Sequence, residues 1–242
     1  MKLLKHAGKL RGLVPQAARE RLYEWHPGRA RRWERYPGLR QVGAGQAVLT
    51  FDDGPDSDAT PAVLDALEQA GVRATFFVLG SQLEEHSEIG AEVLRRGHEI
   101  GLHGYGHPRH DRVGASESRD DVIRGRQVLE DLLGVSPRWY RPPYGKMSDA
   151  AAEACRTLGM STVYWSAWGL DWEPVGEQRI AAVTCEQLSD GGIVLLHDSA
   201  RYARRSSALA TARAIGPIAA WARERGMSLV SLGQAAGAEG HR

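Results

Sequence analysis

The chain has 242 residues, of which 42% are apolar and 25% are charged, which is the composition of a globular protein with a sizeable core. This length suits one large domain, and barrels that alternate strands and helices often use it as a single unit. The net charge of +1 favours no charged partner, and we expect no nucleic-acid binding.

The first 40 residues differ in charge from the rest of the chain. They contain eleven Lys or Arg and three Glu, a net charge of +8, whereas the remaining residues carry a net charge of −7. Four aromatic residues are interspersed among the basic ones: Tyr23, Trp25, Trp33 and Tyr36. Such rings suit an interface where one side of the ring is buried and the other is exposed to water. The segment predicts either a helical extension packed on the outside of the domain or a peripheral contact with an acidic membrane surface.

No export signal or membrane-spanning segment is evident in the sequence. The opening MKLLKHAGKLRGLVPQ is basic but has no apolar run of the roughly 7–15 residues that a signal peptide needs. No other stretch approaches the roughly 18–20 apolar residues of a membrane span. We therefore expect a cytoplasmic protein that can be peripheral to a membrane, with Cys155 and Cys185 as reduced thiols in helices.

From residue 46 onward, short apolar runs alternate with helical patterns. The predicted strands are, in chain order, residues 46–51, 73–80, 98–104, 138–143, 160–168, 191–198 and 227–232. The predicted helices lie between Thr60 and Gly71 and over residues 81–96, 117–133, 149–158, 177–188 and 207–225. Each helix can serve as the crossover between two parallel strands, so the pattern predicts a parallel sheet.

Seven strands and six helices in this length predict a single-domain (β/α)7-type distorted barrel, closed or nearly closed. An open, doubly wound sheet is the alternative. No internal repeat or low-complexity segment interrupts the alternation. We expect residues 46–232 to form this domain, residues 1–45 to form a basic helical extension, and residues 233–242 to be a disordered tail.

Polar clusters follow five of the predicted strands, each at the carboxyl end of its strand. They are TFDDGP (50–55), HGYGH (103–107), RPPYG (141–145), GLDW (169–172) and LLHD (195–198). In a parallel barrel the carboxyl ends of all strands share one face, which is where active sites form. The distribution of the clusters therefore predicts a single site on this face.

Taken separately, these clusters also have ordinary structural interpretations. The glycines between His103 and His107 favour a turn, which can hold two imidazoles toward a metal or form a solvent-exposed loop. Asp52 and Asp53 can belong to a simple turn, but adjacent carboxylates repel each other unless a cation compensates. His197 can be a buried core histidine or an acid–base residue.

In this order, TFDDGP, the H-x-x-x-H pair, RPPYG, the DW pair and LLHD resemble the five motifs of the NodB-like polysaccharide deacetylases, carbohydrate esterase family 4. The resemblance covers residues 46–232 and implies a metal-dependent hydrolase that deacetylates N-acetylated amino sugars. It also implies that Asp53, His103 and His107 bind a divalent cation, with Zn²⁺ favoured and Co²⁺, Ni²⁺ or Mn²⁺ as alternatives. Three such ligands leave open positions, as in catalytic rather than structural zinc sites.

The resemblance assigns catalytic roles to five further residues. Asp52 corresponds to the general base, and Arg141 corresponds to the arginine that orients it. Tyr144 corresponds to the residue whose backbone N–H stabilises the oxyanion. His197 corresponds to the general acid that protonates the leaving amine, with Asp171 as its charge partner.

The resemblance also implies which residues contact the substrate. Trp172 and Leu195 correspond to the walls of the pocket for the acyl methyl group, and we expect Pro143 and Trp168 to contact the substrate as well. Two positions depart from the family pattern. Gly104 stands where the family usually has a Ser or Thr whose hydroxyl ties down the loop. Trp168 stands where an acidic residue often precedes the DW pair.

The favoured hypothesis is an intracellular N-deacetylase that acts on a lipid-linked, nucleotide-linked or small glycosidic amino sugar. The alternative is a related metal-dependent amidase or deformylase acting on another small-molecule amide, because the motifs shape the reacting centre rather than the outer pocket. An inactive carbohydrate-binding homologue would be expected to lack Asp52, His197 or a metal ligand, and the chain retains them all. The sequence does not indicate the oligomeric state.

Overall fold

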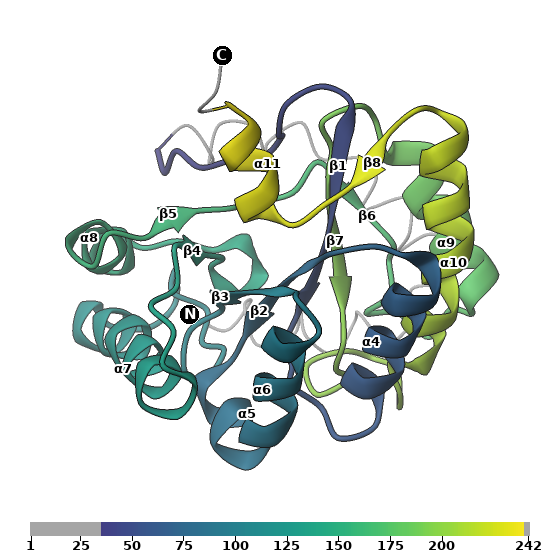
Figure 1. The fold of residues 1–242 in the computed structure, drawn as a ribbon. Helices are drawn as coiled ribbons and strands as arrows, with labels where there is room; N and C mark the ends of the chain where they lie inside the picture. Colours follow the sequence, from purple (N-terminus) through teal and green to yellow (C-terminus); the bar gives the residue numbers. More distant parts are fainter. Residues whose placement is uncertain (1–34, 240–242) are drawn as a thin grey trace, which may run out of the picture. The chain divides into compact units, whose positions relative to one another are not determined.

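The structure, a computed structural model, describes residues 35–239, and the chain divides into two compact units. The second unit begins at Gly38 and contains all the strands and helices discussed below (Figure 1). The first 34 residues of the expected helical extension lie outside the described residues, so that prediction stays untested.

Strands and helices alternate along the described part of this unit. The strands are β1 (Gln46–Asp52), β2 (Thr75–Val78), β3 (Glu99–Leu102), β4 (Trp139–Tyr140), β5 (Ser161–Thr162), β6 (Ala167–Trp168), β7 (Ile193–His197) and β8 (Ser228–Leu229). The helices are α4 (Ala59–Ala70), α5 (Gly80–Glu85), α6 (Ser87–Arg95), α7 (Ala115–Leu133), α8 (Asp149–Thr157), α9 (Glu177–Gln187), α10 (Leu209–Glu224) and α11 (Leu232–Glu239). A short 3₁₀ turn, η1 (Pro143–Gly145), follows β4.

The strands form one curled, parallel sheet. Its order is β5-β4-β3-β2-β1-β7-β6, and β8 pairs with the amino-terminal end of β1. β5 and β6 lie at opposite edges, yet only residues 163–166 connect them. Such a link spans at most roughly 18 Å, whereas the edges of a flat seven-stranded sheet lie about 29 Å apart. The sheet must therefore curl, which confirms the predicted (β/α)7-type distorted barrel.

Two predicted elements are each split in the structure. The predicted strand 160–168 becomes β5, which pairs with β4, and β6, which pairs with β7. Because the segment is rich in apolar residues throughout, its pattern does not mark the point where the chain leaves one edge for the other. The predicted helix 81–96 becomes α5 and α6, because His86 between them has a non-helical backbone (φ −140°, ψ 48°).

The end of the chain corrects one expectation. Residues 232–239 form α11, so the prediction of a disordered tail over 233–242 is wrong for the described part of that segment. Leu232 and Ala235 are buried in the core. The Glu99 carboxylate accepts a hydrogen bond from the first turn of the helix at 2.8 Å. These partners lie far away in the sequence, so a segment rich in alanine and glycine gives no local sign of its burial.

The predicted domain boundary at residue 46 also needs correction. Leu39 forms a parallel bridge with Val163, and Gln41 forms an antiparallel bridge with Gly192. The residues from Gly38 onward therefore belong to the barrel unit rather than to the extension.

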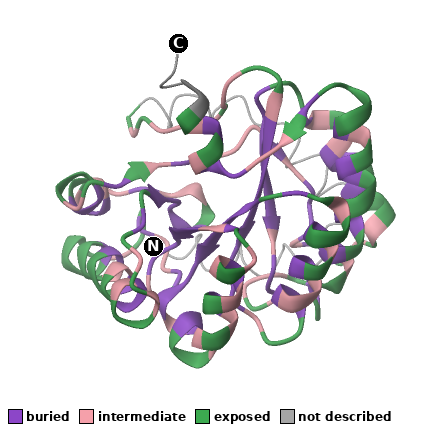
Figure 2. Cartoon of the chain, viewed as in Figure 1, coloured by how far each residue is buried: buried purple, intermediate pink, exposed green. Residues whose placement is uncertain are grey.

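The buried residues run along the strands, and the outer faces of the helices are exposed (Figure 2). Helices α4, α9 and α10 pack together on one side of the barrel, and α7 packs against α5 and α8 on another. Both cysteines are free thiols, Cys155 in α8 and Cys185 in α9. Within residues 35–239, no helix is both long enough and apolar enough to cross a membrane.

Candidate active site

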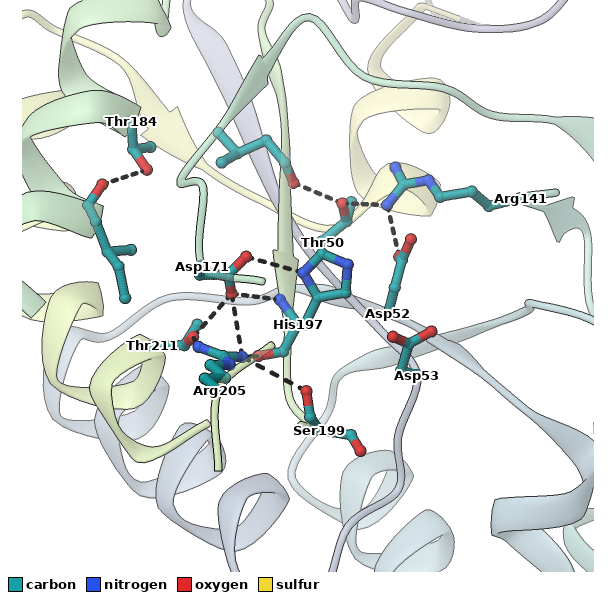
Figure 3. Close-up of polar contacts among 12 residues, drawn as sticks. Thr50, Asp52, Asp53, Arg141, Asp171, Thr184, His197, Ser199, Arg205 and Thr211 are labelled. Atoms are coloured by element: carbon teal, nitrogen blue, oxygen red, sulfur yellow. Dashed lines mark hydrogen bonds and ion pairs between the residues drawn. The ribbon is translucent and has the colours of Figure 1, made fainter. Parts of the chain in front are cut away.

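The polar clusters meet at the carboxyl ends of the strands, as the sequence predicts, and Figure 3 shows Asp52, Asp53, Arg141, Asp171 and His197 on this face. Asp52 ends β1 and His197 ends β7, and the two residues are register partners on neighbouring parallel strands. His103 directly follows β3 and Arg141 directly follows β4, while Asp171 follows β6 after a two-residue link. Residues that are far apart in the sequence therefore share one face of the sheet.

Asp53, His103 and His107, called the ligand cluster below, are buried together with the geometry of a ligand set. One ligand atom from each residue lies within 4.8 Å of the others. Asp53 Oδ1 is 3.1 Å from His107 Nε2 and 3.4 Å from His103 Nε2, yet it accepts no hydrogen bond from the described residues. Polar atoms that face one another in this way without hydrogen bonding converge on a common point, as the ligands of one ion do.

Contacts behind the two imidazole rings hold them in place. His103 Nδ1 lies 2.7 Å from the Arg141 carbonyl oxygen, which can only accept a hydrogen bond. Nδ1 therefore carries a proton, and Nε2, which faces Asp53, is the ring nitrogen that could bind a cation. The His107 ring stacks on Tyr202, with ring centroids 4.1 Å apart. The motifs do not predict this tyrosine, because it lies in the loop after β7.

The carboxylates make the ligand cluster a place that favours positive charge. Burial opposes the ionisation of Asp53, but the neighbouring imidazoles, His107 first and then His103, outweigh this and hold the pKa of Asp53 well below its usual value. Burial lowers the pKa of His107, which favours the neutral imidazole that binds metals. Burial acts the same way on His103, but the carboxylates of Asp52 and Asp53 raise its pKa overall. The donor set of the ligand cluster therefore fits a divalent cation such as Zn²⁺.

Asp52 is held by a buried arginine. Arg141 Nη1 donates to Asp52 Oδ1 at 2.7 Å and to Thr50 Oγ1 at 2.6 Å. The arginine side chain is 0% exposed, and its guanidinium also donates to the Tyr164 carbonyl at 3.0 Å. Burial lowers the pKa of Arg141, but a guanidinium beside a carboxylate keeps its proton. The pair therefore fixes the orientation of Asp52, as the sequence predicts.

Asp171 and His197 form a second carboxylate–cation pair (Figure 3). Asp171 accepts hydrogen bonds from His197 Nδ1 and from the backbone N–H of His197, both at 2.8 Å. Burial opposes the protonation of His197, but Asp171 raises the pKa of the imidazole to about 9. His197 therefore carries its proton at neutral pH, and its Nε2 is directed away from Asp171.

Two residues that the motifs do not predict complete this pair. Thr211 Oγ1 donates to Asp171 at 2.8 Å, while Arg205 Nη2 lies 3.4 Å from the same carboxylate and donates to the His197 carbonyl at 3.0 Å. Burial opposes the ionisation of Asp171, but His197 and Arg205 lower its pKa overall. The sequence does not mark either residue, because an arginine in a loop, such as Arg205, and a threonine in the first turn of a helix, such as Thr211, are common in any protein.

Within residues 35–239, the residues other than glycine that have positive φ angles all lie in the site segments. They are Asp53 (78°), His107 (63°), Tyr144 (57°) and Leu170 (55°). This conformation is unfavourable for residues with a Cβ, and it persists where surrounding contacts hold it. Tyr144 follows the buried Pro143 in η1, and its ring lies 4.5 Å from that of His107. The left-handed turn thus brings Tyr144 beside the ligand cluster.

Of the four expected substrate contacts, Pro143 lies in η1 after β4, and the other three lie on β6, on β7 and in the loop that follows β6. Trp168 in β6 is the register partner of Leu195 in β7, so both side chains point to the same side of the sheet. Leu195 is buried, and the Trp168 indole Nε1 has no hydrogen-bond partner among the described residues. Trp172 meets His197 edge-on, with ring centroids 5.8 Å apart. An apolar surface therefore lies next to His197.

The two other histidines of the 98–110 stretch lie outside the ligand cluster, as the sequence interpretation expects. His98 precedes β3, and its Nδ1 accepts a hydrogen bond from Ala74 N at 3.2 Å. His110 is buried against Asp121 and Tyr140. Both histidines serve packing and hydrogen bonding within the barrel.

Comparisons with known proteins agree with this architecture. Residues 40–163, about half of the chain, match the model of the polysaccharide deacetylase family. A peptidoglycan-N-acetylglucosamine deacetylase of Bacillus cereus is 35% identical over 154 residues, which are 64% of this chain and 56% of that protein. A chitooligosaccharide deacetylase of Bradyrhizobium sp. is 35% identical over 64% of this chain and 72% of that protein. The chain thus spans little more than half of the first relative's length.

Solved structures share the fold and show the family. The Bc1960 peptidoglycan N-acetylglucosamine deacetylase has a TM-score of 0.77 and 30% identity, covering 87% of this chain and 97% of that chain. BA3943, a pseudoenzyme from Bacillus anthracis, has a TM-score of 0.72 at 22% identity, covering 80% of this chain and 66% of that chain, so this likeness concerns the fold alone. The match to the family model and the likeness to Bc1960 show that the chain belongs to the polysaccharide deacetylase family.

Proposed function

We propose that this chain is a metal-dependent N-deacetylase that hydrolyses the acetamide of an N-acetylated amino sugar. The observation that carries the proposal is the ligand cluster, which lies beside one carboxylate pair suited to a base and another suited to an acid. Amide hydrolysis needs both groups, because the carbonyl is weakly electrophilic and the nitrogen is a poor leaving group.

Asp53, His103 and His107 would hold the cation, which polarises the acyl carbonyl and lowers the pKa of a water molecule. Asp52 is the group that takes the proton from the attacking water. Its Oδ1 is bound by Arg141, while its Oδ2 lies on the side of the ligand cluster, 3.8 Å from His103 Nε2. The guanidinium thus holds the carboxylate in place, while the second oxygen faces the ligand cluster and accepts the proton.

His197 donates the proton that the leaving amine needs. Asp171 holds its Nδ1 at 2.8 Å, so the proton available to the substrate is the one on Nε2. With a pKa of about 9, the imidazole is protonated when a substrate binds at neutral pH. Asp171 stays ionised throughout and holds the ring in the orientation that proton donation requires.

Backbone and apolar contacts would position the acyl group. The backbone N–H of Tyr144 is the donor for the oxyanion, and the turn that carries it begins at the buried Pro143. Trp172 and Leu195 would enclose the acetyl methyl beside the acid. Trp168 extends this apolar wall from the register position next to Leu195.

The relatives support the substrate class. They are named as a peptidoglycan-N-acetylglucosamine deacetylase and a chitooligosaccharide deacetylase. Both names refer to a glycan built from N-acetylated amino sugars. For this chain we propose a lipid-linked, nucleotide-linked or small glycosidic N-acetylated amino sugar on the cytoplasmic side of a membrane. The net charge of +8 in residues 1–40 supports a peripheral contact with acidic lipid.

Acetate release from the purified chain, with Zn²⁺ or Co²⁺ added, tests the proposal. The panel contains chitooligosaccharides, peptidoglycan fragments, nucleotide-linked and lipid-linked N-acetylglucosamine, formamides and simple acetanilides. We expect metal-dependent release from at least one acetylated amino sugar and loss of both metal and activity in His103→Ala. Release of the acyl group from the non-sugar amides alone would contradict the proposed substrate class. If no compound of the panel is hydrolysed, the proposal that this chain is a deacetylase is contradicted.

A variant without residues 1–37 tests the proposed membrane contact, because it retains the whole barrel unit. We expect it to lose binding to vesicles that contain acidic lipid and to lose activity on the lipid-linked substrate. Activity on soluble substrates serves as the control. Equal vesicle binding by both forms would contradict the membrane contact.

A further inference from the structure

The loop from His103 to His107 carries two of the three proposed ligands but lacks the family's usual hydroxyl, because its second residue is a glycine. The structure supplies another anchor, Asp121 of helix α7. Tyr105 N and Gly106 N both donate to Asp121 Oδ1, at 3.1 and 2.8 Å. Two successive amide groups that share one carboxylate oxygen form an anion-binding nest, which here is filled by a side chain of the same protein.

The carboxylate occupies the space that a side chain at position 104 would need. A Cβ built on Gly104 would lie 2.2 Å from Asp121 Oδ2, and the φ of Gly104 is +101°, a conformation that other residues rarely adopt. One helical turn further along α7, a Cβ on Gly125 would lie 2.7 Å from the Gly104 carbonyl carbon. The backbone of α7 therefore packs directly on the loop, with Asp121 in the place of the missing side chain.

Asp121 is itself fixed by buried partners. His110 Nε2 lies 3.2 Å from Asp121 Oδ2, and His110 Nδ1 lies 3.3 Å from the Tyr140 hydroxyl. The side chains of His110 and Asp121 are 0% and 7% exposed. Tyr140 ends β4, and the carbonyl of the next residue, Arg141, accepts the hydrogen bond from His103 Nδ1. The loop is thus tied both to α7 and to β4.

We propose that Asp121 is a positioning residue, whose carboxylate holds this loop in the conformation that turns both imidazoles toward Asp53. His107 has a φ of 63°, which the loop adopts only where contacts on neighbouring residues hold it. The two charge-assisted hydrogen bonds to the preceding amides are such contacts. The role in cation binding rests on the proposed function, whereas the role in loop conformation applies to the metal-free protein as well.

Asp121→Ala and Asp121→Asn test the proposal with two measurements. Hydrogen exchange at the Tyr105 and Gly106 amides of the metal-free protein reports on the anchor itself, and titration with Zn²⁺ or Co²⁺ reports on the ligand cluster. In the alanine variant we expect faster exchange at both amides and a metal affinity about 10- to 100-fold weaker, the usual effect of removing a group that orients ligands. The asparagine variant should retain part of the amide protection and part of the metal affinity, because its amide oxygen still accepts hydrogen bonds.

Asp120→Ala is the matched control. Asp120 is exposed on the same helix, and its carboxylate accepts a hydrogen bond from Ser116 Oγ at 3.0 Å. Its removal should leave amide exchange in the loop and metal affinity unchanged. All variants are compared below their thermal unfolding transitions, so that loss of the anchor is distinguished from loss of the fold. Wild-type exchange and wild-type metal affinity in Asp121→Ala would overturn the proposal.

Gly104→Ser, alone and combined with Asp121→Ala, tests the shared space. In the wild-type background the added Cβ meets the carboxylate, whereas in the alanine background these nearest atoms are gone and the positive φ still opposes the substitution. We therefore expect Gly104→Ser to weaken metal binding less in the alanine background, and equal losses would overturn this part of the proposal. A wild-type chain that binds no metal would contradict the proposed function, while amide exchange in the metal-free protein would still decide the role of Asp121.

Discussion

The two carboxylate–cation pairs of the site are built alike but differ in the group that holds the carboxylate. Arg141 lies 2.7 Å from Asp52, and His197 lies 2.8 Å from Asp171. A guanidinium does not release its proton, so in the proposed mechanism Arg141 orients the carboxylate and leaves proton transfer to Asp52. An imidazolium does release its proton, so Asp171 sets the pKa of its partner and would leave proton transfer to His197. In the proposed mechanism the same kind of pairing would thus produce a base on one strand and an acid on the neighbouring strand.

Asp52→Asn should have the largest effect, because it removes the base while preserving the shape of the side chain beside Arg141. We expect kcat for acetate release to fall by about 10²- to 10⁴-fold. Metal content, measured on the same preparation, should stay at the wild-type level because the ligand cluster is intact. A rate close to that of the wild type would show that another group takes the proton.

His197→Ala should reduce kcat on an acetamide by about 10²-fold, because the leaving amine loses its proton donor. The loss should shrink to a few-fold on an aryl acetate, whose phenolate leaving group needs no protonation. Asp52→Asn should remain impaired on both substrates, since each still needs an activated water. Equal impairment of His197→Ala on the amide and the ester would contradict its role as the acid.

The pH dependence of kcat should separate the two pairs further. His197 acts in its protonated form, so activity should decline as the pH rises through the pKa of about 9. Asp171→Asn removes the charge that raises this pKa, so the alkaline decline should move to lower pH. The profile of Asp171→Asn is measured beside the wild type in the same buffers. A decline that stays in place or moves upward would exclude Asp171 as the charge partner.

Thr211→Val should have the smallest effect of these changes. It removes the hydroxyl that donates to Asp171 at 2.8 Å and leaves a buried carboxylate with one donor fewer. We expect the free energy of unfolding to fall by about 1–2 kcal/mol, measured by urea denaturation, with a modest loss of activity. Thr211→Ser, which keeps the hydroxyl, is the control, and an equal loss in both variants would point to packing rather than the hydrogen bond.

The strand-end residues could be predicted because each one is marked locally. An apolar run predicts a strand, and a parallel sheet brings the ends of its strands to one face, so Asp52 and His197 could be placed together without knowledge of their contacts. The same reasoning placed His103 and Arg141 next to them. The polar residues of this face could be placed because the alternation of strands and helices along the chain predicts where each strand ends.

The supporting contacts could not be predicted, because they join residues through space alone. Asp121 looks like an ordinary acidic residue on a helix, and its aim at the 103–107 loop depends on the close packing that Gly125 permits. α11 was missed for the same reason, since its burial depends on strands far away in the sequence. The split of the predicted strand 160–168 follows from closure of the barrel, which no local pattern records.

Selection for stability and selection for chemistry oppose each other at two of the four positions in residues 35–239 where a residue other than glycine has a positive φ. Asp53, His107, Tyr144 and Leu170 each hold a conformation that costs about 1 kcal/mol or more for a residue with a side chain. Glycine would relieve that cost, but at Asp53 and His107 it would also remove a proposed ligand. A search guided by thermostability alone would therefore favour substitutions that erase the site. Gains in heat tolerance that preserve the site must come from elsewhere in the barrel.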